Sequence, residues 1–416
     1  MVSEVSSVAH PANARRGQEP FTRAAPVLSA ALLMGAGGGF VLATVLTTTQ
    51  ATRTATGPWW SAVVQAHGHL QLYGWAGLFI VGVAIHFLPR LRGTPLRFPG
   101  AVPWVLGSLV TSLVLRGLCQ PLVTVTGAGI WRGGLLLSGV LEFLAIGTLM
   151  VIFVTTARSG PPPASRPALW SVLPFLLCAF AALGLASIVN LINMFQAAFS
   201  PLGMVAPSGD DLNVTLGLLG FIVPMALAMS ARSLPMYAGL DAFPRRTLWP
   251  TAFAYIAGVA LAAVGAIGGS QTPGWSSAVY GGGMAIIGAV LLVYVGIFVR
   301  IMRTRGRLPR RVSNLAPEPG AAARKYQTQV ATERGAFGPF VALVGSAYLW
   351  AIIGGLLLVI NGLAQLVGGS PVVVPDAARH SLALGFIALL ISGVAPRMVP
   401  GFSGGHILTP ALVRAT

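Results

Sequence analysis

Ten long apolar segments, almost free of charge, constrain this chain more than any other feature. An α-helix needs about 20 mostly apolar residues to cross a bilayer core. Only 8% of the 416 residues are charged, whereas soluble domains carry about 25%. Strands are disfavoured, because open sheet edges cannot face lipid. The sequence therefore predicts an all-α polytopic transmembrane bundle. The ten expected spans are 25–48, 62–88, 100–121, 132–156, 168–195, 213–236, 248–269, 276–299, 338–367 and 377–396.

The basic residues predict how the spans are oriented. With the N-terminus placed inside, 21 of the 26 Lys and Arg residues fall on one side, 3 on the other and 2 inside spans. Such a bias follows the positive-inside rule, so both termini are expected in the cytoplasm. The excess of positive charge does not indicate nucleic acid binding, because the basic residues lie in short patches between apolar spans. The bilayer itself is the expected partner.

The apolar spans and the basic segments divide the chain into five parts. A polar tail (1–24) precedes helices 1 to 8 (25–299), and helices 9 and 10 (338–396) precede a C-terminal tail (397–416). The segment between helices 8 and 9 (300–337) is the only long loop, and its run RIMRTRGRLPRR is strongly basic. We expect this loop to lie on anionic lipid at the cytoplasmic surface.

Three histidines fall at matching depth on two spans. His67 and His69 lie in AHGHLQLYGW near the start of helix 2, and His380 lies near the start of helix 10. Both helices run from outside to inside, which places His67 and His380 about 5–8 Å below the outer boundary. Two imidazoles from facing helices can bind a haem iron axially. Neutral imidazole also binds copper or zinc.

Two points about these histidines stay open in the sequence. His69 points about 200° away from His67 on a helix, so only one of the two can face the same ligand. An intramembrane histidine can also simply hydrogen-bond across helices. His86 lies about 28 Å along the helix from His67 and cannot share its site. It is either a metal ligand at the inner face or an interfacial residue beside phospholipid, and His406 joins it only if the C-terminal tail folds back.

Arginines in or beside the spans are the next candidates. A charged group inside a membrane is costly and usually faces the bundle interior. Arg116, near the outer end of helix 3 in LVLRGLCQPL, is the candidate partner of a haem propionate, because guanidinium binds carboxylates in a bidentate manner. Arg132 and Arg379 stand at the starts of helices 4 and 10, and we interpret them as extending to the headgroups.

Two further buried charges have several interpretations. Glu142 lies at mid-depth in helix 4 and is expected to be neutral or paired. It either relays protons or hydrogen-bonds across the bundle to Asn190, Asn193 or Asn361. Arg232 lies near the inner end of helix 6, where its default role is a structural tie to a carbonyl group or a lipid phosphate. The glycine runs MGAGGG, YGGGM and IIGG predict close helix packing.

Three segments, in order along most of the chain, resemble the NnrS family. They are AHGHLQLYGWAGLFIVGVAIHFLPR, MSARSLPMYAG and HSLALGFIALLISGVAPRMVPGFSG. The first resembles the second helix of that family, except that Leu70 and Gln71 replace its Glu-Met pair. The residues that match the family pattern are His67, His69, Gly74, Trp75, Arg232, Pro235, His380, Gly385 and Arg397.

The resemblance implies a multi-pass protein of the bacterial inner membrane, associated with haem, copper and the nitric oxide response. Proteins of the family usually have about twelve spans, so it also implies that two C-terminal spans are missing from the ten seen here. A more distant likeness is to the catalytic subunits of haem-copper oxidases and nitric oxide reductases. These hold a low-spin haem between histidines of helices 2 and 10, which corresponds to His67 and His380. Their catalytic metal centre needs histidines in helices 6 and 7, and this chain has none there.

The sequence thus predicts a haem-binding membrane protein, with copper as a second candidate, in the nitric oxide response or in protection of metal centres. His67 and His380 are the expected axial ligands, His69 is the alternative ligand, and Arg116 is the propionate partner. Two other classes remain. One is a haem-bearing electron-transfer or accessory subunit of a respiratory complex that resembles an oxidase or nitric oxide reductase. The other is a transporter that uses the histidines and Glu142 as a proton or metal-ion path. Whether the chain turns over nitric oxide is left open.

Overall fold

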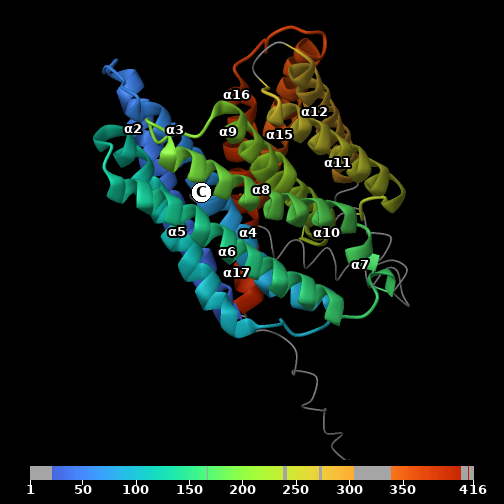
Figure 1. Cartoon of the computed structure of the whole chain (residues 1–416). Coiled ribbons are helices and arrows are strands. Elements are labelled where there is room, and N and C mark those ends of the chain that lie inside the picture. Colours follow the sequence, from blue (N-terminus) through green and yellow to red (C-terminus); the bar gives the residue numbers. More distant parts are fainter. Residues whose placement is uncertain are drawn as a thin grey trace, which may run out of the picture.

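A computed structural model describes residues 21–165, 167–237, 241–270, 274–303, 339–403 and 411. Ten helices within these ranges are long and apolar enough to cross a membrane, and they form one bundle (Figure 1). No strand occurs among the described residues. The predicted all-α polytopic bundle is therefore confirmed. The expectations for most of the N-terminal tail, for the basic loop beyond residue 303 and for His406 lie outside the described residues.

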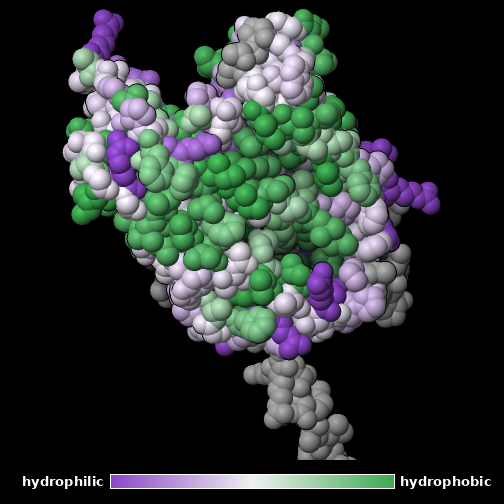
Figure 2. Space-filling model, viewed as in Figure 1, coloured by the Kyte–Doolittle hydropathy of each residue, from purple (hydrophilic) through white to green (hydrophobic). Residues whose placement is uncertain are grey.

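The outer surface of the bundle matches a lipid environment. Hydrophobic residues cover much of its side in the view of Figure 2. Large apolar side chains such as Leu177, Phe195 and Val293 are more than half exposed, at 61%, 55% and 56%. Side chains of this kind would be costly in water, so they are expected to face acyl chains. The chain is a multi-pass membrane protein.

Six spans are built on one regular α-helix each. Backbone groups in lipid must bond within their own segment, and a helix satisfies this requirement. Glycine follows the last residue of two helices, α4 (Leu78–Arg92) and α5 (Val102–Thr126). Gly93 and Gly127 have φ of 64° and 66°, in the left-handed region that glycine adopts without strain. The six helices are α5 (Val102–Thr126), α6 (Gly129–Ser159), α8 (Leu173–Phe199), α11 (Arg245–Ile267), α12 (Trp275–Met302) and α15 (Phe340–Leu366).

The other four spans each contain a π-helical segment between two α-helices. Span 1 comprises α1 (Ala25–Leu33), η3 (Met34–Phe40) and α2 (Val41–Ala51). Span 2 comprises α3 (Trp59–His69), η4 (Leu70–Gly77) and α4 (Leu78–Arg92). Span 6 comprises α9 (Pro207–Val214), η7 (Thr215–Ile222) and α10 (Val223–Tyr237). Span 10 comprises α16 (Pro375–His380), η8 (Ser381–Ala388) and α17 (Leu389–Ser403).

The span boundaries expected from the sequence need small corrections. Every expected span overlaps an observed one, and most helices run on past the expected boundaries, although span 5 begins later, at Leu173, and span 9 is shorter, at Phe340–Leu366. The clearest case is the last span, where α17 continues to Ser403, so that Arg397 lies inside the helix and not in a tail. Likewise α12 continues to Met302. Hydropathy falls at the first charged residue, whereas the helical hydrogen bonds continue through it.

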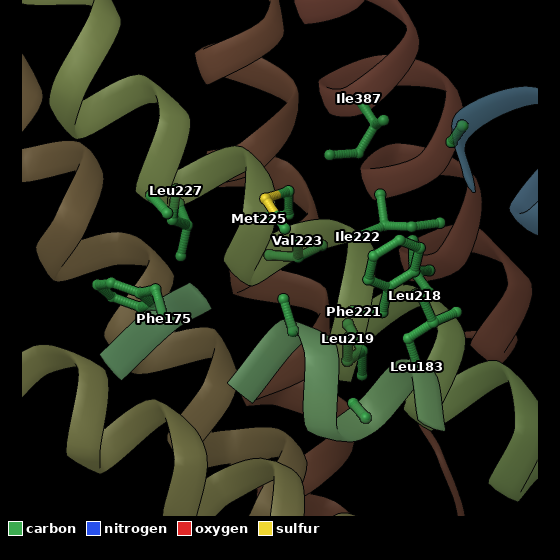
Figure 3. Close-up of a cluster of buried hydrophobic side chains, with 14 of the residues drawn as sticks. Phe175, Leu183, Leu218, Leu219, Phe221, Ile222, Val223, Met225, Leu227 and Ile387 are labelled. Atoms are coloured by element: carbon green, nitrogen blue, oxygen red, sulfur yellow. The ribbon is translucent and has the colours of Figure 1, made fainter. Parts of the chain in front are cut away.

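Glycine runs bring helices into close contact, as the sequence predicts. A Cβ atom on Gly283 would lie 2.4 Å from the backbone nitrogen of Ala262, so α12 and α11 approach backbone to backbone. In η3, a Cβ atom on Gly39 would lie 2.5 Å from Cδ of Gln71 in η4. In the centre of the bundle, apolar side chains of η7 and α8 pack beside Ile387 of η8 (Figure 3). This core separates the two ends of the bundle.

Candidate functional site

A cavity of about 350 Å³ lies between spans 1, 2, 3, 6 and 10. Its walls include four of the residues singled out in the sequence, namely His67, His69, His380 and Arg116. We call it the histidine cavity. These residues come from three different spans, and the helices that carry the three histidines, α3 and α16, lie toward the same end of the bundle in Figure 1. The expectation that helices 2 and 10 face each other here is consistent with this geometry.

The histidine cavity is where the π-helical segments of the described chain meet. Each of the four segments contributes to its wall, for example Phe40 from η3, Tyr73 from η4, Leu218 from η7 and Leu384 from η8. A π-helical turn contains an extra residue and changes how side chains project from the helix, and such turns are frequent at functional sites. The π-helical segments could not be predicted from the sequence, because they leave no simple pattern of hydrophobicity.

His67 and His380 are held in the same way. Nδ1 of His67 lies 2.8 Å from the carbonyl oxygen of Gly39 in η3. Nδ1 of His380 lies 2.9 Å from the carbonyl oxygen of Asp376, one turn earlier in α16. A carbonyl oxygen can only accept, so each Nδ1 must donate its hydrogen. In a neutral imidazole, Nε2 then carries the free lone pair. This is the usual arrangement of a metal-bound histidine, whose other nitrogen donates to a carbonyl or carboxylate group.

His69 has a different environment. Its Nε2 lies 2.8 Å from Oε2 of Glu142, and both side chains are buried. The hydroxyl of Ser112 lies 3.3 Å from the same carboxylate oxygen. The predicted hydrogen bonds of Glu142 to asparagines are therefore replaced by a bond to His69. Since Nε2 of His69 is occupied by this carboxylate, the arrangement favours His67 as the ligand of the pair.

Arg116 is buried, with 2% of its surface exposed, and lines the histidine cavity. One of its terminal nitrogens donates to Oδ1 of Asn190 in α8. Its Nε atom has no partner, and neither do Nδ2 of Asn190 and Oε1 of Glu142. Buried groups of this kind are normally satisfied. The unsatisfied Nε can therefore serve an acceptor that occupies the cavity.

The start of span 6 supplies carboxylates that the sequence analysis missed. Asp211 forms an ion pair with Arg379 at 2.5 Å, and Arg379 also contacts Asp376 at 3.1 Å. Arg379 thus ties the start of span 10 to the start of span 6, and does not extend to headgroups as expected. Asp210 lines the histidine cavity together with Arg379. The adjacent pair of acidic residues at a span boundary was the available signal.

Arg132 also differs from its expected role. Its terminal nitrogen Nη1 donates to the carbonyl oxygens of Ala198 and Ser200 at 2.8 and 2.6 Å. These carbonyls lie at the C-terminal end of α8, where helical partners are absent and a cation is favourable. Arg132 therefore caps a neighbouring helix.

His86, Arg232 and Arg397 lie away from the histidine cavity, and none of them lines it. The ring of His86 stacks on Phe402 with 4.2 Å between centroids. Arg232 lies over the ring of Phe87 at 5.4 Å. The structure thus separates His86 from His67 and His380, as the sequence analysis expected from the distance along helix 2.

The donor set of the histidine cavity bears on what it can bind. Among the described residues, no group of three or more His, Cys, Asp or Glu side chains is placed to bind a metal ion. Protein sites for copper or zinc usually need at least three such ligands. A haem supplies four ring nitrogens and needs one or two axial protein ligands. The two histidines therefore fit haem better than a bare copper ion.

Comparison with known proteins adds no assignment. No model of a known protein family matches this chain, and no curated protein matches its sequence.

Proposed function

We propose that this chain binds a haem in the histidine cavity, where Nε2 of His67 and Nε2 of His380 would hold the iron. The observation that supports this most strongly is that both imidazoles line one cavity while each Nδ1 donates to a backbone carbonyl. Orientation by a backbone acceptor fixes the tautomer and raises the basicity of the other nitrogen.

The other walls of the cavity also fit a haem. A porphyrin needs apolar contacts for its faces and cationic partners for its propionates. Leu72, Leu218 and Ile387 supply the first kind of contact. Arg116 supplies the second, since its Nε is buried and has no partner. A guanidinium group binds a carboxylate with two charge-assisted hydrogen bonds.

The two ligands differ in how firmly they are held. His67 is half-buried and its acceptor lies on another span, whereas His380 is exposed and its acceptor lies in its own helix. A bound haem would supply an iron that binds small diatomic ligands such as nitric oxide. His380 would be the more easily displaced of the two histidines, because it is exposed and its acceptor lies in its own helix. The likeness to the NnrS family supports a role in the nitric oxide response or in protection of metal centres.

The location is part of the same proposal. We place the chain in the bacterial inner membrane with both termini in the cytoplasm. The bias of basic residues supports this orientation. The histidine cavity then opens toward the outer side, because it lies where spans 2, 6 and 10 begin.

An absorption spectrum of the detergent-purified protein, oxidised and reduced, tests the proposal. Sharp reduced α and β bands are expected from a haem with two histidine ligands. A colourless protein from haem-replete cells would contradict haem binding.

Addition of nitric oxide to the haem-loaded protein then separates two functions. A shifted spectrum is expected for a nitric oxide sensor, whereas an unchanged spectrum would favour an electron-transfer subunit.

Replacement of Gly39 by alanine should weaken haem binding. The new Cβ atom would lie 2.5 Å from Cδ of Gln71, so the Gln71 side chain must shift within the wall of the histidine cavity, and any accompanying displacement of Gly39 lengthens the hydrogen bond of His67. Loss of a second-sphere partner of a metal-bound histidine costs about 10- to 100-fold in affinity. The measurement is the haem-to-protein ratio during titration. Gly37→Ala is the matched control, because its Cβ atom would meet nothing within 4 Å.

A further inference from the structure

A second cavity lies at the other end of the core. It has a volume of about 120 Å³ and is bounded by α4, α8, α10 and α17. We call it the apolar cavity, because its walls are aliphatic and aromatic except for Ser230 and Ser233. Ile222 and Ile387 separate it from the histidine cavity, since both residues line both spaces. A space of this composition disfavours water and accepts hydrocarbon.

Polar groups without partners gather at one end of this cavity. The Oγ atom of Ser233 lines it, is buried, and has no hydrogen-bond partner. Next to Ser233 in α10, the Nε and Nη1 atoms of Arg232 are also buried and have no partner. The guanidinium group lies 5.4 Å from the centre of the Phe87 ring, and Phe87 is part of the cavity wall. Hydrogen-bond donors of Ser233 and Arg232 thus lie at the edge of the apolar cavity.

The charge of Arg232 calls for an anion. No described carboxylate lies within ion-pair distance of this guanidinium, whose charge is permanent. The Arg232 residue is half-buried, but its Nε and Nη1 atoms are shielded from solvent, and a cation shielded in this way without a counterion is unfavourable. A second guanidinium on the same side of the bundle adds positive charge, since that of Arg397 lies 5.4 Å from the ring centre of Tyr237 in α10. Phosphate matches guanidinium through paired hydrogen bonds.

We propose that this end of the bundle binds an anionic phospholipid, whose phosphate accepts hydrogen bonds from Arg232 and one of whose acyl chains enters the apolar cavity. The hydrocarbon space and the unpartnered donors adjoin, which matches an amphiphile with an anionic head. The site does not depend on haem, because it lies on the opposite side of Ile222 and Ile387 from the histidines.

Native mass spectrometry of protein released from nanodiscs tests this site. The nanodiscs contain equal amounts of dioleoyl phosphatidylglycerol and dioleoyl phosphatidylcholine. We expect the wild-type protein to retain one phosphatidylglycerol, and Arg232→Gln to weaken this retention about tenfold through loss of charge-assisted bonds. Arg232→Lys should recover part of it. Arg300→Gln is the control, because Arg300 is exposed at the end of α12 and should not affect retention.

A second variant tests the acyl chain. Ala226 lines the apolar cavity, and Ala226→Phe should fill the space and abolish retention while Arg232 is intact. Helix content and melting temperature show whether each variant is folded. Equal retention by wild type and Arg232→Gln would overturn the proposal. Two other results would also overturn it. One is that inorganic phosphate alone raises the melting temperature of the wild-type protein while Ala226→Phe retains the lipid normally. The other is that the retained ligand proves to be a quinone.

Discussion

In His380→Ala protein, the sharp reduced α and β bands of a haem with two histidine ligands should disappear. The alanine leaves one coordination position of the iron without a protein ligand. Apart from His380, only His67 and His69 among the described histidines line the histidine cavity. His67→Ala should have the larger effect on haem content, since His67 is half-buried and held from another span. Visible spectra and haem-to-protein ratios of the purified variants measure both effects.

Two other histidines provide matched controls for this experiment. His69→Gln can still donate to Glu142 and should keep the spectrum. His86→Phe preserves the stacking on Phe402 and should also keep it. If His69→Gln loses the bands while His67→Ala retains them, the assignment of the ligand on span 2 is wrong. If all four variants keep the bands, the haem lies elsewhere.

Removal of the carboxylate of Glu142 should produce the largest loss of stability. Glu142→Leu leaves His69 without its buried partner, whereas Ser112 keeps its hydrogen bond to the carbonyl oxygen of Ser138. Breaking a buried pair on one side costs about 3–5 kcal/mol. Glu142→Gln should cost less, because its amide still bonds to His69. Reversible unfolding in mixed detergent micelles measures the free energy of unfolding.

A lipid-facing residue on the same helix serves as the control. Leu144 lies in α6 two residues beyond Glu142 and is 47% exposed, so Leu144→Ala removes contacts with acyl chains and not with the bundle. Its effect should stay within about 1 kcal/mol. Equal stabilities of Glu142→Leu and Leu144→Ala would show that the network around Glu142 contributes nothing to the fold.

The number and order of the spans could be predicted from the sequence because burial in lipid depends on composition over about 20 residues. The pairing of His67 with His380 on one cavity could be anticipated from depth, since alternating spans place the starts of helices 2 and 10 on one side. Arg116 was placed near the same site by this reasoning. All three side chains line the histidine cavity.

Particular partners could not be predicted, because they depend on how helices rotate and pack. Glu142 had several polar residues at compatible depth, and only the orientation of α3 and α6 brings His69 within 2.8 Å of it. Arg379 was expected at the headgroups, yet the approach of α9 provides Asp211 as its partner. The acceptor of His67 is a backbone carbonyl, which no residue type reveals. Each of these contacts joins segments far apart in the sequence.

The π-helical segments have a further consequence for how the spans evolve. A π turn contains one residue more than an α turn, so a residue can be gained or lost there while the helices on both sides keep their orientation. In span 2, loss of one residue from η4 would leave His67 and the wall residues of α4 in place, and would move only the side chains of η4 that line the histidine cavity. The two ends of the span can therefore stay unchanged while the segment between them changes. Related chains should differ by single-residue gaps at these segments, and each gap would mark the gain or loss of a site.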